Sequence, residues 1–305
     1  MKRSTSVSHS LRLRVDLPNL DQVTSTLRLD CLDQNFLMFK TVLVALAIVF
    51  FTSVAVGQRT APAPKVELER ITERGRQLAE YDVAAWHATD AVLELKPEES
   101  NVSRYIARKA DSKWTVVFGR QNEKRDRFLI AYEATQGLSP TEFAVKKYQP
   151  PKEDTEFYST AAKAIDVSLA DFRGENRPYN VAALPADANQ IYVYVLPAQT
   201  KADVYPLGGD VRYLVSQDGS RIIGKRQLHK AIIEFSSSED QQMVAGFQTA
   251  VLDDVPEDTD VFLVLTRKPS VPQYIGTRKY VYRIEVDGTV NYVTTMEAFQ
   301  KIPRK

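Results

Sequence analysis

After residue 65 the apolar positions recur every three, four or seven residues, which is the spacing of one face of an α-helix. The positions in this stripe are Leu68, Ile71, Gly75, Leu78, Ala85 and Val92. A proline disfavours helical backbone in the residue before it, so Pro97 ends the pattern. The spacing therefore predicts one helix over residues 66–95.

Trp86 and His87 of this helix are expected to point in different directions relative to the apolar stripe. At about 100° per residue, Trp86 lies about 70° from the centre of the stripe and His87 about 170° from it. We therefore expect Trp86 to pack against the sheet that follows and His87 to face outward.

Beyond residue 100 the period of the apolar positions changes to two, which is typical of half-buried strands. Three strands are predicted, at residues 103–109, 113–119 and 127–134, with polar turns between them. Residues 149–155 (QPPKEDT) combine proline and charge, and we interpret them as a boundary.

The second half repeats the order of a helix followed by strands. Its helix has an apolar face formed by Phe157, Ala161, Ile165, Leu169 and Phe172. Nine strands are predicted after it, at residues 180–184, 190–196, 210–216, 221–227, 231–235, 243–252, 261–267, 279–286 and 290–294. A short helix is expected at residues 295–301.

Local signals place some of these strands. The Asp-Gly pairs at residues 218–219 and 287–288 predict tight hairpins. Both alternating sets of the strand at 190–196 are apolar or aromatic, so this strand is expected in the centre of a sheet, covered on both faces. The predicted fold class is therefore α+β: two helix-then-antiparallel-meander units, at residues 66–148 and 155–305, with the second sheet larger.

A different pattern precedes these units. Ten apolar residues run from Val42 to Phe51 behind Lys40, and small residues follow, ending in Ala55-Val56-Gly57. A basic start, a short apolar stretch and a small-x-small exit predict a secretory signal peptide at residues 38–57, followed by a Pro/Ala linker at 58–65. An uncleaved signal anchor is the alternative, and residues 41–57 would then be the only membrane segment.

The predicted signal begins at Met38, which leaves residues 1–37 to explain. We interpret them as a gene-model extension, and a disordered cytoplasmic tail before an anchor is the alternative. They contain Cys31, the only cysteine of the chain, so a chain cleaved after Gly57 is free of disulfides. About 250 residues can bury a core without such cross-links, and bacterial export fits this composition best.

Charge and composition exclude several classes of protein. Lys plus Arg number 40 and Asp plus Glu 39, so the formal net charge is +1, and removal of residues 1–57 would leave −1. A dedicated nucleic-acid binder would carry a basic excess, so no nucleic-acid partner is expected. The hydrophobic fraction of 44% is that of a globular chain, which argues against extensive disorder.

The candidate chemistry is sparse. The chain contains no nucleophile elbow, no phosphate-binding loop and no dinucleotide fingerprint, and no cofactor is expected. His87 with Asp90 three residues on, and separately His229, are the weak catalytic candidates, because a histidine beside a carboxylate can act as a general base. For both histidines a plain surface or structural role is the competing interpretation.

One acidic segment is the only metal candidate. Five carboxylates gather in eight residues, and a calcium ion requires several oxygen ligands. They are Asp253, Asp254, Glu257, Asp258 and Asp260. The spacing is not that of a known calcium loop, so a solvated connector is the favoured interpretation.

The expected function is that of an exported, non-catalytic protein that binds an unidentified protein or envelope component in the periplasm, in the envelope or outside the cell. The alternative is an exported hydrolase with a site assembled from scattered carboxylates and His87 or His229. A surface pocket that unites a histidine with two or more carboxylates would favour the hydrolase. A flat or tyrosine-lined sheet face without such a pocket would favour binding.

Overall fold

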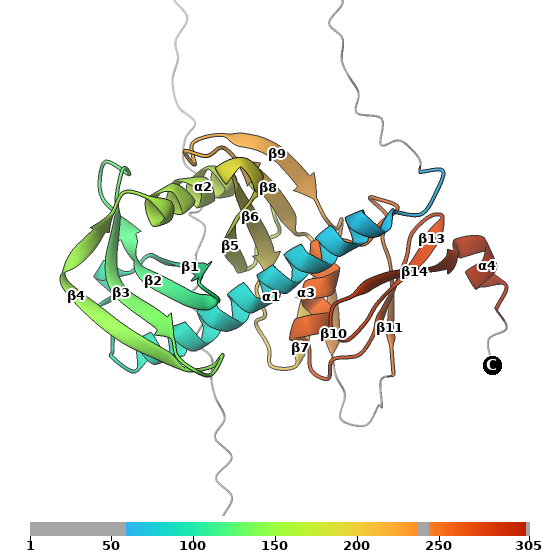
Figure 1. Cartoon of the computed structure of the whole chain (residues 1–305), viewed down its shortest axis with the longest axis horizontal. Helices are drawn as coiled ribbons and strands as arrows, with labels where there is room; N and C mark the ends of the chain where they lie inside the picture. Colours follow the sequence, from blue (N-terminus) through green and yellow to red (C-terminus); the bar gives the residue numbers. More distant parts are fainter. Residues whose placement is uncertain (1–58, 237–243, 303–305) are drawn as a thin grey trace, which may run out of the picture. The chain divides into compact units, whose positions relative to one another are not determined.

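The computed structural model describes residues 59–236 and 244–302 (Figure 1). These residues belong to one of the two units into which the chain divides. The predicted signal peptide and the segment 1–37 lie outside the described residues. Among the described residues, no helix is long and apolar enough to cross a membrane.

The first predicted helix is present as α1 (Lys65–Leu93), and every residue of the predicted apolar stripe is buried. A short 3-10 turn (Glu99–Asn101) follows it. The expectation for Trp86 was wrong: Tyr81, on the same helix, is the buried aromatic side chain at 2% exposure, whereas Trp86 and His87 are both only half-buried. Tyr81 and Trp86 flank the predicted stripe on opposite sides, and the side that carries Tyr81, together with Ala84 and Ala88, is the buried one.

The first sheet contains the three predicted strands and one that was missed. The antiparallel order is β1-β2-β3-β4, formed by β1 (Arg104–Ala110), β2 (Lys113–Gln121), β3 (Phe128–Gln136) and β4 (Phe143–Asp154). β4 runs through the proline-rich residues that we had interpreted as a break. A proline pair is tolerated there because β4 is an edge strand.

The second half begins with α2 (Phe157–Asp171), as predicted. Its first sheet has the order β5-β6-β8-β9, formed by β5 (Tyr179–Pro185), β6 (Ile191–Pro197), β8 (Val211–Val215) and β9 (Ile222–Gln227). β6 is an interior strand and almost wholly buried, which confirms the prediction from its doubly apolar pattern. A two-stranded ribbon pairs β7 (Val204–Leu207) with β10 (Ile233–Ser236), and a 3-10 turn spans Asp187–Asn189.

The C-terminal third forms another four-stranded sheet, in the order β11-β12-β13-β14. Its strands are β11 (Gly246–Thr249), β12 (Gln273–Gly276), β13 (Tyr280–Ile284) and β14 (Val290–Thr295). The predicted strand at residues 261–267 was wrong, because these residues belong to α3 (Asp258–Thr266). The short apolar run VFLVL fits either element, and only the helix carries the chain from β11 to a parallel β12.

A last helix, α4 (Met296–Gln300), ends the described chain as expected. Both Asp-Gly pairs lie in the hairpins that they predicted, β8–β9 and β13–β14, with Gly219 and Gly288 at positive φ. The fold class is therefore α+β, with helix-then-meander order, and the strands of the second half divide between two four-stranded sheets and a ribbon.

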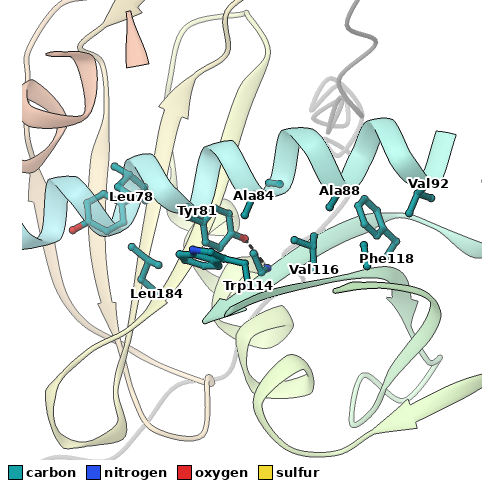
Figure 2. Close-up of a cluster of buried hydrophobic side chains, with 14 of the residues drawn as sticks. Leu78, Tyr81, Ala84, Ala88, Val92, Trp114, Val116, Phe118 and Leu184 are labelled. Carbon is teal, nitrogen blue, oxygen red and sulfur yellow. Dashed lines mark hydrogen bonds between the residues drawn. The ribbon is translucent and has the colours of Figure 1, made fainter. Parts of the chain in front are cut away.

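Three buried clusters hold these layers together, and α1 contributes to two of them. The C-terminal half of α1 packs on β1, β2 and β3, and the Tyr81 hydroxyl accepts a bond from the Ala107 amide of β1 at 3.3 Å (Figure 2). The N-terminal half, through Leu68 and Ile71, packs on α3 and the C-terminal sheet. The remaining cluster fills the space between the first sheet, α2 and the β5–β9 sheet. Both predicted units thus contribute side chains to common cores.

Candidate functional site

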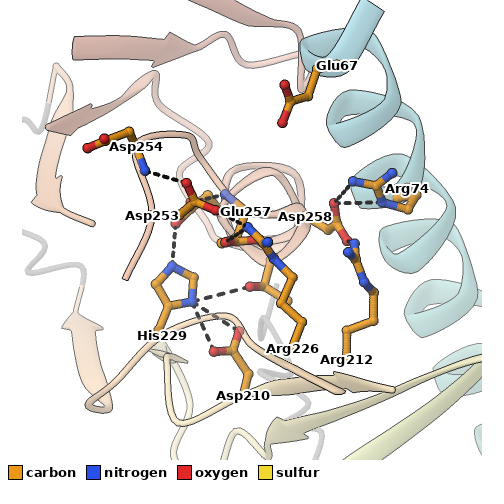
Figure 3. Close-up of polar contacts among 12 residues, drawn as sticks. Glu67, Arg74, Asp210, Arg212, Arg226, His229, Asp253, Asp254, Glu257 and Asp258 are labelled. Atoms are coloured by element: carbon orange, nitrogen blue, oxygen red, sulfur yellow. Dashed lines mark hydrogen bonds and ion pairs between the residues drawn. The ribbon is translucent and has the colours of Figure 1, made fainter. Parts of the chain in front are cut away.

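The acidic segment before and within α3 is buried, contrary to the favoured interpretation as a solvated connector. Asp258 and Asp260 have no exposed area, and Asp254 and Glu257 are 2% and 4% exposed. Buried carboxylates are stable only when they are paired or hydrogen-bonded. Their partners come from α1, β6, β8, β9 and the loop after β9, and together they form an ionic network at the N-terminus of α3 (Figure 3).

Asp258, the first residue of α3, connects three other elements. One carboxylate oxygen accepts Nε and Nη2 of Arg74 on α1, at 2.9 and 2.8 Å. The other accepts the Tyr194 hydroxyl of β6 at 2.8 Å and a guanidinium nitrogen of Arg212 on β8. Burial alone would lower the pKa of each arginine, but the Asp258 charge outweighs burial and raises both.

The position of Asp258 depends on a close approach of two helices. Gly75 of α1 faces Val261 of α3, and a Cβ placed on Gly75 would lie 2.4 Å from the Val261 Cβ. No larger residue fits at position 75 without moving one helix. Glycine therefore lets the neighbouring Arg74 reach the Asp258 carboxylate.

Glu257 forms the second part of the network with Arg226 of β9. The guanidinium donates to both carboxylate oxygens, at 3.1 and 2.6 Å, and its Nη2 also reaches Asp253 at 2.8 Å. Burial raises the pKa of Glu257 to about 7, against the opposing effect of Arg226 and with a further contribution from the charges of Asp258 and Asp260. A neutral Glu257 is thus accessible at ordinary pH.

His229 lies between two buried carboxylates. Its Nδ1 is 3.0 and 3.2 Å from the two oxygens of Asp210, and its Nε2 is 3.1 Å from Asp260. An ionised carboxylate only accepts hydrogen bonds, so both ring nitrogens must carry protons. Burial opposes the positive charge, but Asp210 and Asp260 outweigh it and raise the pKa of His229 well above its usual value.

Asp260 continues the network into the C-terminal sheet. It accepts the Glu257 amide at 2.7 Å and the side-chain amide of Gln248 on β11. Gln248 accepts from Gln273 of β12 at 3.3 Å, and Gln273 in turn accepts from Arg267 at 2.8 Å. The chain of contacts links the ionic network to the inner face of the sheet.

The two other candidates lie elsewhere. His87, on the C-terminal half of α1, stacks on the Trp86 ring with centroids 5.0 Å apart, and Asp90 is exposed. The structure gives no hydrogen bond or ion pair between His87 and any carboxylate among the described residues. His229 is thus the histidine that the fold brings together with acidic side chains.

The calcium candidates do not converge on one point. Asp258 engages Arg74 and Arg212, Glu257 and Asp253 engage Arg226, and Asp260 engages His229. Asp254 is paired loosely with Arg278 at 3.6 Å. In the part of the chain that the structure describes, no group of three acidic, histidine or cysteine side chains has the geometry of a metal site.

Sequence reasoning found His229 but missed every arginine of this network. Arg74 stands next to Gly75 in the apolar stripe of α1, and Arg212 interrupts the apolar alternation of the interior strand β8. A charged side chain at such a position is a signal of a buried partner. Asp210, directly before β8, is 1% exposed and gave no signal of its own.

One hollow of about 490 Å³ lies elsewhere, at the turn between β2 and β3. Its lining is polar and mixed in charge, and includes Arg120, Lys124, Asp126 and Glu153. None of its lining residues belongs to the ionic network. The network is therefore a set of satisfied buried charges and not the wall of that hollow.

Comparison with known proteins adds no family. The sequence matches no family model and no curated protein, and the fold matches no solved structure.

Proposed function

We propose that this chain is an exported, non-catalytic protein that binds a protein or envelope component through the outer face of its C-terminal sheet. Two observations support the proposal. His229, the histidine with acidic neighbours, has both nitrogens engaged and cannot accept a proton. The outer face of the β11–β14 sheet, in contrast, carries aromatic side chains, of which Phe247 is exposed and Tyr274 is half-buried.

Strand register defines that outer face. Phe247 of β11, Tyr274 of β12 and Arg283 of β13 lie side by side, on the face opposite the buried Ile275 and Ile284. Phe247 is 49% exposed. The face also receives Phe299 of α4.

Phe299 stacks on Phe247 with centroids 5.7 Å apart and rings 6° from parallel, and Arg283 lies 5.7 Å from the Tyr274 ring centroid. We name Phe247, Tyr274, Arg283 and Phe299 the aromatic face. Aromatic and arginine side chains are the residue types enriched at the centres of protein interfaces. A half-exposed phenylalanine on a sheet face also loses hydrophobic free energy unless a partner covers it.

The first experiment measures binding of the purified chain, residues 58–305, to isolated envelopes of its source cells. We expect saturable binding that Phe247→Ser together with Tyr274→Ser weakens at least tenfold. Leu138→Ser is the matched control, because Leu138 is a fully exposed apolar residue outside the aromatic face. Equal binding by the two variants would reject this face as the binding surface.

A second experiment tests export. A reporter fused behind residues 38–65 should appear outside the cytoplasm, with its new N-terminus at Gln58. Retention of residues 40–51 in the membrane fraction would favour the anchor instead.

The hydrolase alternative rests on one observation, the His229–Asp210 pair, which is the histidine–carboxylate arrangement of many general bases. It requires Nε2 to leave Asp260 and to become accessible to a substrate. Hydrolysis of p-nitrophenyl esters that His229→Gln abolishes in a folded variant would favour this alternative over binding.

A further inference from the structure

The first sheet carries a concentration of positive charge that the rest of the chain lacks. The sheet, residues 104–154, contains eleven Lys or Arg and seven Asp or Glu, a net charge of +4, although the whole chain has only +1. The remainder of the chain is therefore at −3. The excess is not spread evenly over the sheet.

Strand register places five of these cations on the face toward α2, and one of them, Arg104, is paired with Asp166 of α2. Arg108 pairs with Thr115, which pairs with Thr135, and Lys146 pairs with Glu133. Ile106 and Val117 of the same face are buried against α2. The cross-strand row of Arg108, Thr115 and Thr135 lies next to them, so it continues the same face beyond the helix. Lys113 and Lys152 follow by the same alternation.

Tyr148 of the edge strand β4 lies on this surface beside Lys146 and Lys152. Lys146 and Lys152 lie over its ring, with Nζ 4.7 and 5.4 Å from the centroid. Its hydroxyl donates to Glu133 at 3.3 Å, and Glu133 also receives Lys152 at 3.4 Å. The lysine amines are thus held against an aromatic ring instead of moving freely in solvent.

A third cation, Arg108 of β1, is held against an aromatic ring in the same way. The Arg108 guanidinium lies 4.8 Å from the ring centroid of Phe157, and Phe157 contacts Tyr158 edge-on. Burial first, and then the Glu133 charge, raise the pKa of Tyr158 to about 12, so its hydroxyl remains protonated. We name Arg108, Lys113, Lys146, Lys152, Tyr148 and Tyr158 the basic face.

Most of its cations have no acidic partner. Among the described residues, no carboxylate lies within 4 Å of the charged nitrogens of Arg108, Lys113 or Lys146, and all three side chains are exposed. Arginines 74, 212 and 226 are all neutralised at short range. Cations that the fold positions but does not neutralise produce a local positive potential that attracts anions.

We propose that the basic face binds an anionic polysaccharide that carries carboxylate groups. The cations of the basic face form ion pairs with the carboxylate groups of the polysaccharide. The hydroxyls of Tyr148, Tyr158 and Thr135 and the acceptor Glu133 match the many hydroxyl groups of a sugar chain, which an acidic peptide does not offer. This binding is independent of the aromatic face, which lies on a different sheet.

The experiment measures binding of residues 58–305 to polygalacturonate by calorimetry at 50 and 300 mM salt, with neutral dextran and poly-L-glutamate as comparison polymers. We expect polygalacturonate to bind, with an affinity that falls at least tenfold at the higher salt because exposed charges are screened. Dextran should not bind, and poly-L-glutamate should bind at least tenfold more weakly.

Arg108→Ala with Lys146→Ala should weaken polygalacturonate binding at least tenfold. The matched control is Lys124→Ala with Arg125→Ala, which removes the same charge from exposed residues of the β2–β3 turn and should change binding less than twofold. Equal losses in the two variants would show attraction by net charge alone and overturn the proposal. Tighter binding of poly-L-glutamate would overturn it in favour of an acidic peptide, and the absence of polygalacturonate binding would overturn it outright.

Discussion

The molecule contains two charged regions that behave in opposite ways. In the ionic network at the start of α3, Asp258 has no exposed area and is neutralised by arginines from α1 and β8. On the basic face of the first sheet, Arg108 and Lys146 are exposed and have no carboxylate partner among the described residues. The acidic segment is a charged run in the sequence, whereas the cations of the basic face are scattered along it. Whether such charges become neutralised depends on partners that are distant along the chain.

This difference separates charges that stabilise the fold from charges that are available to a ligand. Removal of one member of a buried pair leaves the other charge without solvent or partner, which is costly. Removal of an exposed, unpaired cation leaves the folded state nearly unchanged. Substitutions in the two regions should therefore give stability effects of very different size.

The largest effect is expected for Asp258→Ala. It leaves Arg74 and Arg212 facing each other without an anion, so the free energy of unfolding should fall by about 3–5 kcal/mol. Urea denaturation measures the change. The control is Glu69→Ala, an exposed helix pair with Lys65, which should cost less than about 0.5 kcal/mol. A loss for Asp258→Ala as small as the control's would show that the network contributes no stability.

The next effect is expected for His229→Gln. A neutral amide cannot donate to Asp210 and Asp260 from opposite sides as the imidazolium does, so we expect a loss of about 3 kcal/mol. His87→Gln provides the matched control, with an expected loss below about 0.5 kcal/mol because its ring is not tied to a carboxylate. Similar losses in the two variants would contradict the contrast between the two histidines.

The third prediction concerns pH. The folded-state pKa of Glu257, about 7, lies above the unfolded value of 4.5, so the folded state holds more protons between these values. Glu257 therefore makes its full contribution to the free energy of unfolding below pH 4.5, and this contribution is lost as the pH rises through about 7. Its slope is at most about 1.4 kcal/mol per pH unit.

His229 acts in the same direction at higher pH. Its folded-state pKa is raised, so its contribution is complete below its unfolded value of 6.5 and is lost as pH rises through the folded value. Urea titrations from pH 4.5 to 8 should therefore show a downward slope that Glu257→Gln reduces below pH 7. An unchanged slope in that variant would assign the titration to another group.

The smallest effect is expected on the basic face. Arg108→Ala with Lys146→Ala should change the free energy of unfolding by less than about 0.5 kcal/mol per residue, as exposed substitutions usually do. A loss comparable to that of Asp258→Ala would mean that these cations have a structural partner and would remove the contrast.

The parts of the fold that follow from local periodicity could be predicted. The apolar stripe of α1, the face of α2, the hairpins at Gly219 and Gly288 and the doubly apolar strand β6 all depend on spacing or turn chemistry within a few residues. Other elements could not. β7 and β12 have four residues each and were missed, β4 was missed because its proline pair favours a break, and the nine residues of α3 carry an apolar run that also fits a strand.

The candidate site was only half predictable. The sequence singled out His229 and the acidic segment because those residues stand out locally. Whether a carboxylate is solvated or buried depends on which cation meets it, and Arg74 is 184 residues from Asp258 along the chain. Periodicity and motif spacing relate residues that are close in the sequence and cannot pair residues so far apart. The acidic segment was therefore wrongly interpreted as a solvated connector.

The long helix α1 has a consequence for the order of folding. Leu68 and Ile71 complete their core only with Val261 and Val264 of α3, almost two hundred residues later. Contacts between such distant parts of a chain form slowly, because a long loop must close first. During synthesis the apolar side of α1 must therefore wait for the C-terminal third to emerge. Export, as proposed for this chain, would then start from a chain whose first helix has not yet completed its core.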